Sequence, residues 1–305
     1  MSKAAELAAL IGSQSALSDR NMIINGAMAV SERGTSFSAP NGVYTLDRMR
    51  CAQANSADTI SQQTFTAGQT GVPGSPKNFL RFAFGAATAN RVLETRIEDV
   101  YTASGQSITL SFYAKASEAH TSSIEMTQSF GSGGSSAVAF GTQNYDITTS
   151  FQRFEFALSC PSISGKTVGA GNYLSAAFVR SLSAGPSINV DIALLQLEIG
   201  EQATPFEHRS LADDLAMCQR YYYKLKSSSS NNFFGYAMAA NTTAMYLAVP
   251  FPVEMRSNPT SIDVTAGSSG NIGYWLGGAV TAFTSIGISE SGPSMTTLVM
   301  QVSSG

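Results

Sequence analysis

The stretch ITLSFYAK, residues 108–115, decides the fold class of this chain. Ile108, Leu110, Phe112 and Ala114 take one parity, and Thr109, Ser111, Tyr113 and Lys115 take the other. Strict alternation of this kind predicts a strand with one face on a core and one face toward solvent. The same pattern recurs in three further stretches, 79–84, 153–158 and 188–192.

Turn-rich stretches separate these runs, at 67–76, 131–136 and 163–172. Many short strands with Gly, Pro and Ser between them are typical of an antiparallel sandwich or barrel. We assign this β body to residues 21–208. Near Leu194 and Leu195 the alternation changes parity, which predicts a bulge or a strand that changes sheets.

A helix is expected next, over residues 209–226. Ser210 is a good N-cap, Asp213 and Asp214 suit the first turn, and Lys224 and Lys226 suit the last. Its expected apolar stripe, which should join two β domains, consists of Leu211, Leu215, Cys218, Tyr222 and Leu225. Strand patterns return after it, so we expect a second β-rich domain over 227–305.

Charge is scarce in this sequence of 305 residues, of which only 13% are Asp, Glu, Lys or Arg, with a net charge of −3. Nucleic-acid binding normally needs a basic surface, so we expect no nucleic-acid partner. Residues 233–305 carry only four ionised side chains, Glu254, Arg256, Asp263 and Glu290. We therefore expect this domain to bury surface against copies of itself or to meet a neutral ligand.

The amino-terminal stretch of residues 1–20 is expected to self-associate or to dock onto a neighbouring protein. Residues 3–11 have a helical composition, but about nine residues do not hold a helix alone in water. Glu6 interrupts the apolar run, so no export signal is predicted. No stretch reaches the ~18 apolar residues of a membrane span, so we expect no membrane insertion. We expect the protein to be made in a cytoplasm.

Catalytic signatures are absent from the sequence. It has no GxSxG, P-loop, GxGxxG or HExxH motif, and its cysteines, Cys51, Cys160 and Cys218, show neither zinc spacing nor a disulfide framework. The neighbouring carboxylates Glu98–Asp99 fall on opposite faces of a strand, and Asp213–Asp214 suits a helix start. We predict no enzymatic activity, no catalytic residue, no metal and no cofactor.

Sugar binding without catalysis remains, because it needs only aromatic platforms and hydrogen-bonding groups. Tyr236, Tyr274 and Trp275 are the candidate ligand-binding residues, the last two in the stretch GYWLGG. Trp275 occupies either an exposed loop tip or a buried strand. Tyr101, Tyr113, Tyr145 and Tyr173 are weaker candidates, for which we favour structural roles.

Several segments, spread in order over about residues 20–260, resemble a family of bacteriophage virion proteins. This family comes mostly from marine and cyanobacterial phages and is labelled tail fibre or receptor-binding. The segments are NMIINGAM (21–28), RGTS (33–36), YTLDR (44–48), RIED (96–99), LSFYAK (110–115), LQLEIG (195–200), ATPFEHR (203–209), CQRYY (218–222), FPVEMR (251–256) and PT (259–260). The sequence departs from the family at Met49, where tryptophan is common.

The resemblance implies a jelly-roll sandwich like that of carbohydrate-binding modules. It also implies a short tail fibre that helps adsorb to the host, located in the virion, with a homotrimer as its assembly. Its partners would be other virion proteins, through the amino-terminus, and a host cell-surface glycan. A head fibre or capsid-decoration protein is the alternative, and a polysaccharide depolymerase is a second one.

Overall fold

The computed structural model describes residues 19–85, 90–181, 187–225, 235–262, 273–276 and 279–301. The predicted helix at 3–11, and residues 1–18 generally, lie outside these ranges. The chain divides into two compact units, Met1–Leu215 and Ala216–Gly305, which are described separately below.

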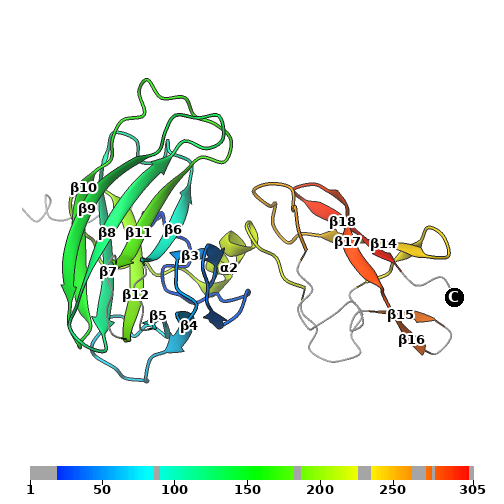
Figure 1. Ribbon diagram of the computed structural model, residues 1–305, viewed down its shortest axis with the longest axis horizontal. Helices are drawn as coiled ribbons and strands as arrows, with labels where there is room; N and C mark the ends of the chain where they lie inside the picture. Colours follow the sequence, from blue (N-terminus) through cyan, green and yellow to red (C-terminus); the bar gives the residue numbers. More distant parts are fainter. Residues whose placement is uncertain are drawn as a thin grey trace, which may run out of the picture. The chain divides into compact units, whose positions relative to one another are not determined.

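Unit 1 is an antiparallel β-sandwich of two six-stranded sheets (Figure 1). Sheet A has, in spatial order, β1 (Ser36–Ser38), β4 (Thr59–Thr64), β5 (Asn78–Phe84), β12 (Ile188–Ile199), β7 (Ser107–Ala116) and β10 (Gln152–Ser159). Sheet B has β2 (Val43–Tyr44), β3 (Met49–Gln53), β6 (Arg91–Glu98), β11 (Tyr173–Ser181), β8 (His120–Ser129) and β9 (Val138–Ile147). From β4 to β12 the chain crosses between the sheets six times. The predicted jelly-roll sandwich is confirmed.

The core lies between the inner faces of the two sheets, on the side chains that the alternation selected. Phe112 on β7 is 1% exposed, and its ring centroid lies 5.5 Å from that of Tyr145 on β9 and 6.5 Å from that of Phe178 on β11. One aromatic ring of sheet A therefore contacts two strands of sheet B. The hydroxyl of Tyr145 donates to the Phe178 carbonyl at 2.5 Å, so its polar end is satisfied inside the core.

The parity change in β12 is a β-bulge, as predicted. The register against β7 shifts between Ala193 and Gln196, and Leu194 has a left-handed φ of 51°. Leu195 then points inward beside Leu197, both fully buried. Gly26 packs so closely on the bulge that a Cβ there would lie 2.1 Å from the Leu195 carbonyl oxygen, which explains why this turn residue has no side chain.

The helix, α2 (Leu211–Gln219), is shorter than the predicted 209–226. Ser210 caps it as expected: the Asp213 amide donates to Ser210 Oγ at 3.1 Å, and Ser210 Oγ donates to the Asp213 carboxylate at 2.6 Å. The predicted stripe is wrong in part, because Leu211 is 61% exposed and Tyr222 and Leu225 lie beyond the helix end. Three consecutive tyrosines, which are poor helix formers, follow Arg220 and account for the early end.

Unit 2 is β-rich, as predicted. Its four-stranded antiparallel sheet has the order β13 (Met238–Ala239), β14 (Ala244–Pro250), β18 (Met295–Gln301) and β17 (Ser285–Ser291), and a hairpin pairs β15 (Gly273–Leu276) with β16 (Ala279–Ala282). Met245, Leu247, Ile286 and Met300 gather with Phe283 into a small core. The predicted alternation in β14 and β18 is therefore correct.

Candidate binding faces

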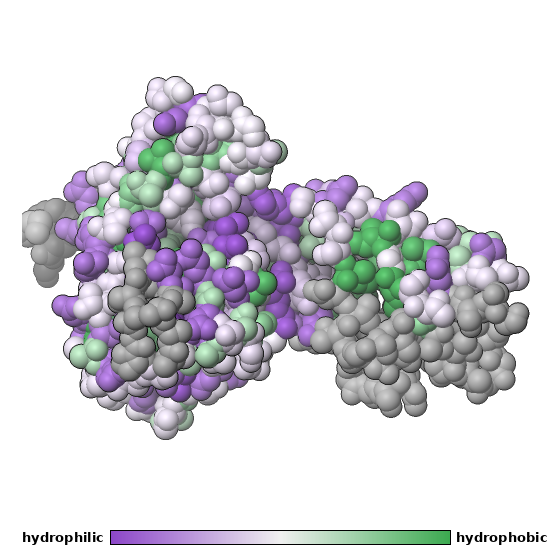
Figure 2. All heavy atoms as spheres, viewed as in Figure 1, coloured by the Kyte–Doolittle hydropathy of each residue, from purple (hydrophilic) through white to green (hydrophobic). Residues whose placement is uncertain are grey.

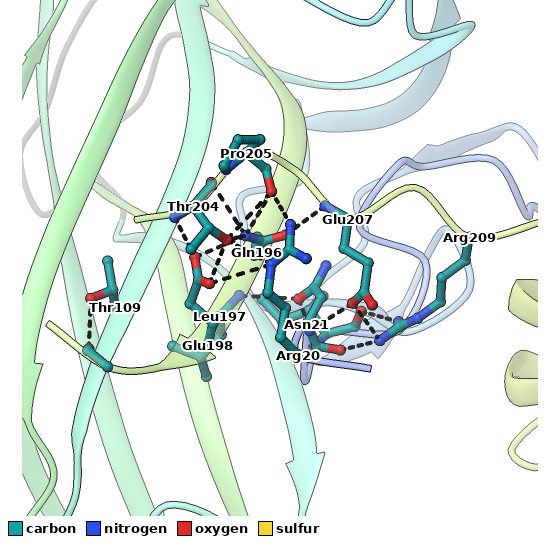
Figure 3. Close-up of polar contacts among 12 residues, drawn as sticks. Arg20, Asn21, Thr109, Gln196, Leu197, Glu198, Thr204, Pro205, Glu207 and Arg209 are labelled. Atoms are coloured by element: carbon teal, nitrogen blue, oxygen red, sulfur yellow. Dashed lines mark hydrogen bonds and ion pairs between the residues drawn. The ribbon is translucent and has the colours of Figure 1, made fainter. Parts of the chain in front are cut away.

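Three segments of the phage-protein resemblance, 21–28, 195–200 and 203–209, meet where the chain enters and leaves the sandwich (Figure 3). Arg20 Nε donates to Thr204 Oγ1 at 2.6 Å and lies 3.5 Å from Glu198 Oε2. Thr204 Oγ1 in turn donates to Glu198 Oε2 at 2.6 Å. The amide of Asn21 donates to Glu207 Oε2 at 2.8 Å. These contacts bind the entering segment to the exit segment 203–209.

Asparagine side chains complete this junction. Asn21 Oδ1 accepts from the amides of Ile23 and Leu197, at 3.0 and 3.1 Å. Asn25, with φ 61°, donates from Nδ2 to the carbonyls of Val30 and Asp47, at 2.9 and 2.8 Å. Buried polar groups whose bonds stay within the chain fix backbone geometry. The junction is therefore architectural.

The outer face of sheet B carries a continuous polar network, which we call the β6–β11 face. Arg50 on β3 lies opposite Glu94 on β6, and Arg96 on β6 lies opposite Ser175 on β11. The Glu94 carboxylate accepts from Arg50 Nη1 and Arg96 Nε, each at 2.9 Å, and from Ser175 Oγ at 2.6 Å. Three side chains, one from each of three strands, thus donate to one carboxylate.

The β6–β11 face also includes a cation–π contact. The Arg96 guanidinium carbon lies 4.1 Å from the ring centroid of Tyr173, a cation–π distance. Farther along the face, Glu125 Oε2 on β8 lies 3.4 Å from Arg180 Nη2 and accepts from Thr142 Oγ1 at 3.1 Å. The face therefore offers donors, acceptors and a flat surface fixed by mutual contacts.

The outer face of sheet A differs, because chain segments cover part of it. Phe65, Phe79 and Phe151 cluster with centroid distances of 4.7, 5.3 and 5.9 Å. Val72, from the loop between β4 and β5, and Phe206, from the exit segment, pack on the same cluster. Phe206 thus anchors the chain as it leaves the sandwich. Less of this outer face is left for a ligand.

The ligand-binding residues predicted in unit 2 are only partly described. Tyr236 is fully exposed, at 102%, beside β13. Tyr274 and Trp275 lie on β15, and their side chains lie outside what the structure describes. Exposed apolar side chains of this unit also include Met238 and Met295, and Figure 2 shows hydrophobic surface on the face of the unit in view. Of the three predicted residues, the structure therefore describes the side chain of Tyr236 alone.

The weaker aromatic candidates separate clearly. Tyr145 is buried in the core, as a structural role requires, whereas Tyr101 is 60% exposed. Tyr173 lies on the β6–β11 face, which the sequence reading did not single out. The sequence signal for this face is that Glu94, Arg96 and Glu98 occupy one parity of their strand, opposite to Leu93 and Ile97. That signal marks an outward face but does not say which strands lie beside it.

Reactive groups in the described residues have structural environments. All three cysteines are buried thiols, and burial, with the Asp58 charge, raises the pKa of Cys51 to about 12. Burial also raises the pKa of the Asp47 and Asp214 carboxyls. The hydrogen bonds that they accept from the Arg33 and Asn25 amides act in the opposite direction and lower the pKa, but burial has the larger effect. Among the described residues, no three His, Cys, Asp or Glu side chains are grouped to hold a metal ion. No helix within the described ranges is long and apolar enough to cross a membrane.

No protein-family model and no curated protein matches the sequence. Solved structures give partial likenesses. A putative sugar binding protein from Bacteroides thetaiotaomicron has a TM-score of 0.41 at 16% identity, covering 59% of this chain and 100% of that one. The enzymatically active domain of bacteriophage CBA120 tailspike protein 4 has a TM-score of 0.37 at 15% identity, covering 56% of this chain and 22% of that one.

A family 11 carbohydrate-binding module from Clostridium thermocellum, in complex with a mixed-linked tetrasaccharide, has a TM-score of 0.33 at 11% identity. It covers 54% of this chain and 94% of that one. All three TM-scores lie below 0.5, so no conclusion about the ligand of this chain follows from them. The resemblance to phage fibre proteins stays a prediction.

Proposed function

We propose that this chain is a non-catalytic, glycan-binding structural protein of a phage virion, a short tail fibre that contributes to host adsorption. The observation that carries glycan binding is the β6–β11 face, where the Arg96 guanidinium lies over the Tyr173 ring while its Nε bonds to Glu94. The phage setting rests on the resemblance of the ordered sequence segments.

Fold stability alone gives a weak reason for such a network. Ion pairs at partly exposed positions contribute about 0–1 kcal/mol each, because solvent screening and side-chain entropy oppose them. Arg50, Arg96, Glu125 and Arg180 are all partly exposed. A ligand gains from the same arrangement, since prearranged donors and acceptors need no ordering when it binds.

A sugar fits the chemistry of this face. Hydroxyl groups pair with guanidinium donors and carboxylate acceptors, and the apolar side of a pyranose ring stacks on a flat surface such as the Arg96–Tyr173 pair. Thr127 and Thr142 add neutral hydroxyls around it; Thr127 lies opposite Ser175, which in turn lies opposite Arg96, in the strand register.

Two alternatives have distinct readouts. A head fibre or capsid-decoration protein would use the same sandwich at another virion position, so antibody labelling of intact particles distinguishes tail from head. A polysaccharide depolymerase would release reducing ends from host polysaccharide. The proposed partners are further copies of this chain and, through residues 1–20, other virion proteins.

Binding of the purified protein to an immobilised array of neutral and acidic bacterial oligosaccharides tests glycan binding. We expect binding to some members of the array, about tenfold weaker or more for Arg96→Gln, because a charge-assisted hydrogen bond and a cation–π contact are lost. Arg153→Gln, on sheet A, is the matched control and should bind like the wild type. Equal binding by folded Arg96→Gln would remove the β6–β11 face from the proposal, and failure to bind any array member would count against glycan binding.

A further inference from the structure

The outer face of sheet A holds a pair of cations that the β6–β11 face does not involve. Arg81 on β5, Asp191 on β12 and Lys115 on β7 lie opposite one another in the strand register. Arg81 Nε lies 2.7 Å from Asp191 Oδ1, and its Nη2 lies 2.9 Å from Oδ2. Lys115 Nζ lies 3.7 Å from that same Oδ2. Two positive side chains therefore converge on one carboxylate.

The three charges differ in what solvent reaches. The Asp191 side chain is 3% exposed, whereas those of Arg81 and Lys115 are 32% and 33% exposed. The carboxylate is thus occupied by the bidentate Arg81 contact, and the cations face outward. Among the described residues, the Lys115 ammonium lies 3.7 Å from Asp191 Oδ2, which is too far for a hydrogen bond. It also lies 5.0 Å from the centroid of the Phe151 ring. Its three donors are available to an incoming acceptor.

The surroundings of this pair are apolar on one side and polar on the other. The Phe65–Phe79–Phe151 cluster borders the cations, since Lys115 lies over Phe151 and Arg81 lies 5.8 Å from the Phe79 ring. On the other side lie neutral polar residues: Ser61 pairs with Arg81 in the register, and Asn189 follows one pleat away on β12. An apolar border lowers the effective dielectric constant around the two cations and so strengthens their attraction to an anion.

We propose that Arg81 and Lys115 form a second ligand site, for the carboxylate of an acidic sugar such as a uronic acid. The carboxylate would bridge Arg81 Nη1, which the Asp191 contact leaves out, and Lys115 Nζ. The apolar C–H face of the sugar ring would lie against the half-buried Phe151 ring, at the edge of the phenylalanine cluster. This site lies on the opposite sheet from the β6–β11 face and does not depend on it.

Titration of the full chain with glucuronic acid, followed by nuclear magnetic resonance of the Arg81 side-chain Nε–H, tests the proposal. Glucose is the neutral matched probe, and inorganic sulfate tests for a general oxyanion site. We expect saturable shifts with glucuronic acid that weaken as salt is added, and no saturation with glucose over the same range. Competition by sulfate at equal concentration would replace sugar recognition with plain oxyanion binding and overturn the uronic-acid assignment.

Lys115→Gln should weaken glucuronic acid binding about tenfold, because one charge-assisted contact is lost while the Arg81–Asp191 pair remains. Lys166→Gln is the matched control, since this exposed lysine also lies over a phenylalanine ring. Its Nζ is 5.9 Å from the centroid of the Phe130 ring. Lys115→Arg should retain binding, which separates loss of charge from loss of folding. Unchanged affinity in folded Lys115→Gln, or equal affinity for glucose and glucuronic acid, would overturn the site.

Discussion

Arg91 and Asp58 form an ion pair inside the sandwich, with Arg91 Nε 3.1 Å from Asp58 Oδ2 and side chains only 1% and 0% exposed. Asp58 also accepts from the amides of Asn55 and Gly85, at 2.7 and 2.8 Å. The pair therefore connects β6 to the turn before β4 and to the end of β5. Both charged groups are therefore buried away from solvent.

Asp58→Asn should destabilise unit 1 by about 3–5 kcal/mol, because it removes the carboxylate charge that faces the buried Arg91 guanidinium. Glu155→Gln is the matched control: Glu155 pairs with Arg153 at 3.1 Å but is 48% exposed, so its loss should cost under ~1 kcal/mol. Denaturant unfolding of both variants measures the difference. Equal costs would mean that the Arg91 charge finds compensation elsewhere.

His120 should make the stability of unit 1 depend on pH. Burial, followed by the nearby Arg91 charge, lowers its pKa from 6.5, and its Nε2 is buried without a hydrogen bond in the described structure. Glu118 opposes this shift, and the Phe84 ring packs edge-on at 5.7 Å. The unfolded chain then binds this proton more tightly, so stability should fall as pH drops below about 6.5.

Denaturant midpoints between pH 7.5 and 5.5 measure this effect. His120→Gln should flatten the decline, whereas His208→Gln, at the exposed second histidine, should retain it. The same slope in wild type and His120→Gln would assign the decline to other groups.

One leucine of the sandwich core and two leucines of α2 form a series of decreasing burial. Leu110→Ala, at a fully buried core position, should cost about 2–5 kcal/mol, and Leu211→Ala, on the exposed helix face, well under 1 kcal/mol. Leu215 is half-buried, so Leu215→Ala should fall between them. Thermal midpoints of the three variants measure the order. A cost at Leu211 as large as that at Leu110 would show that this face is covered in the assembled protein.

Assembly is a prediction from charge and from resemblance. The scarcity of charge in residues 233–305 favours a homo-oligomer, and the resemblance to fibres implies a trimer of about 96 kDa, three times 32.0 kDa. Light scattering at micromolar concentration measures the mass. A monomer of 32 kDa would contradict self-association, and a dimer would contradict only the trimer.

Adsorption through unit 2 is a separate prediction. If Trp275 lies at an exposed tip with Tyr236 and Tyr274, Trp275→Ala should leave folding intact and reduce adsorption of phage particles. Binding of a neutral glycan should then change little with salt, since no charge attraction is involved. Misfolding of the variant would instead place Trp275 in a core. Full adsorption by folded particles would remove this residue from receptor binding.

Local pattern determined much of the fold. The alternation over 108–115 selected Leu110 and Phe112 as core residues, the parity change located the bulge at Leu194, and Ser210 marked the start of the helix. Each of these features depends on neighbours within a few residues, where side-chain direction and backbone propensity act directly.

Tertiary structure alone decided which polar residues lie together. Arg50, Arg96 and Ser175 meet at Glu94 only because β3, β6 and β11 pair in one register, and a shift of one residue would turn each side chain to the opposite face. Arg81 and Lys115 reach Asp191 for the same reason, across strands more than seventy residues apart in the chain. Sequence fixes the parity of each strand by itself, whereas the choice of partner strand depends on the packing of the whole sandwich, and both candidate sites depend on that choice.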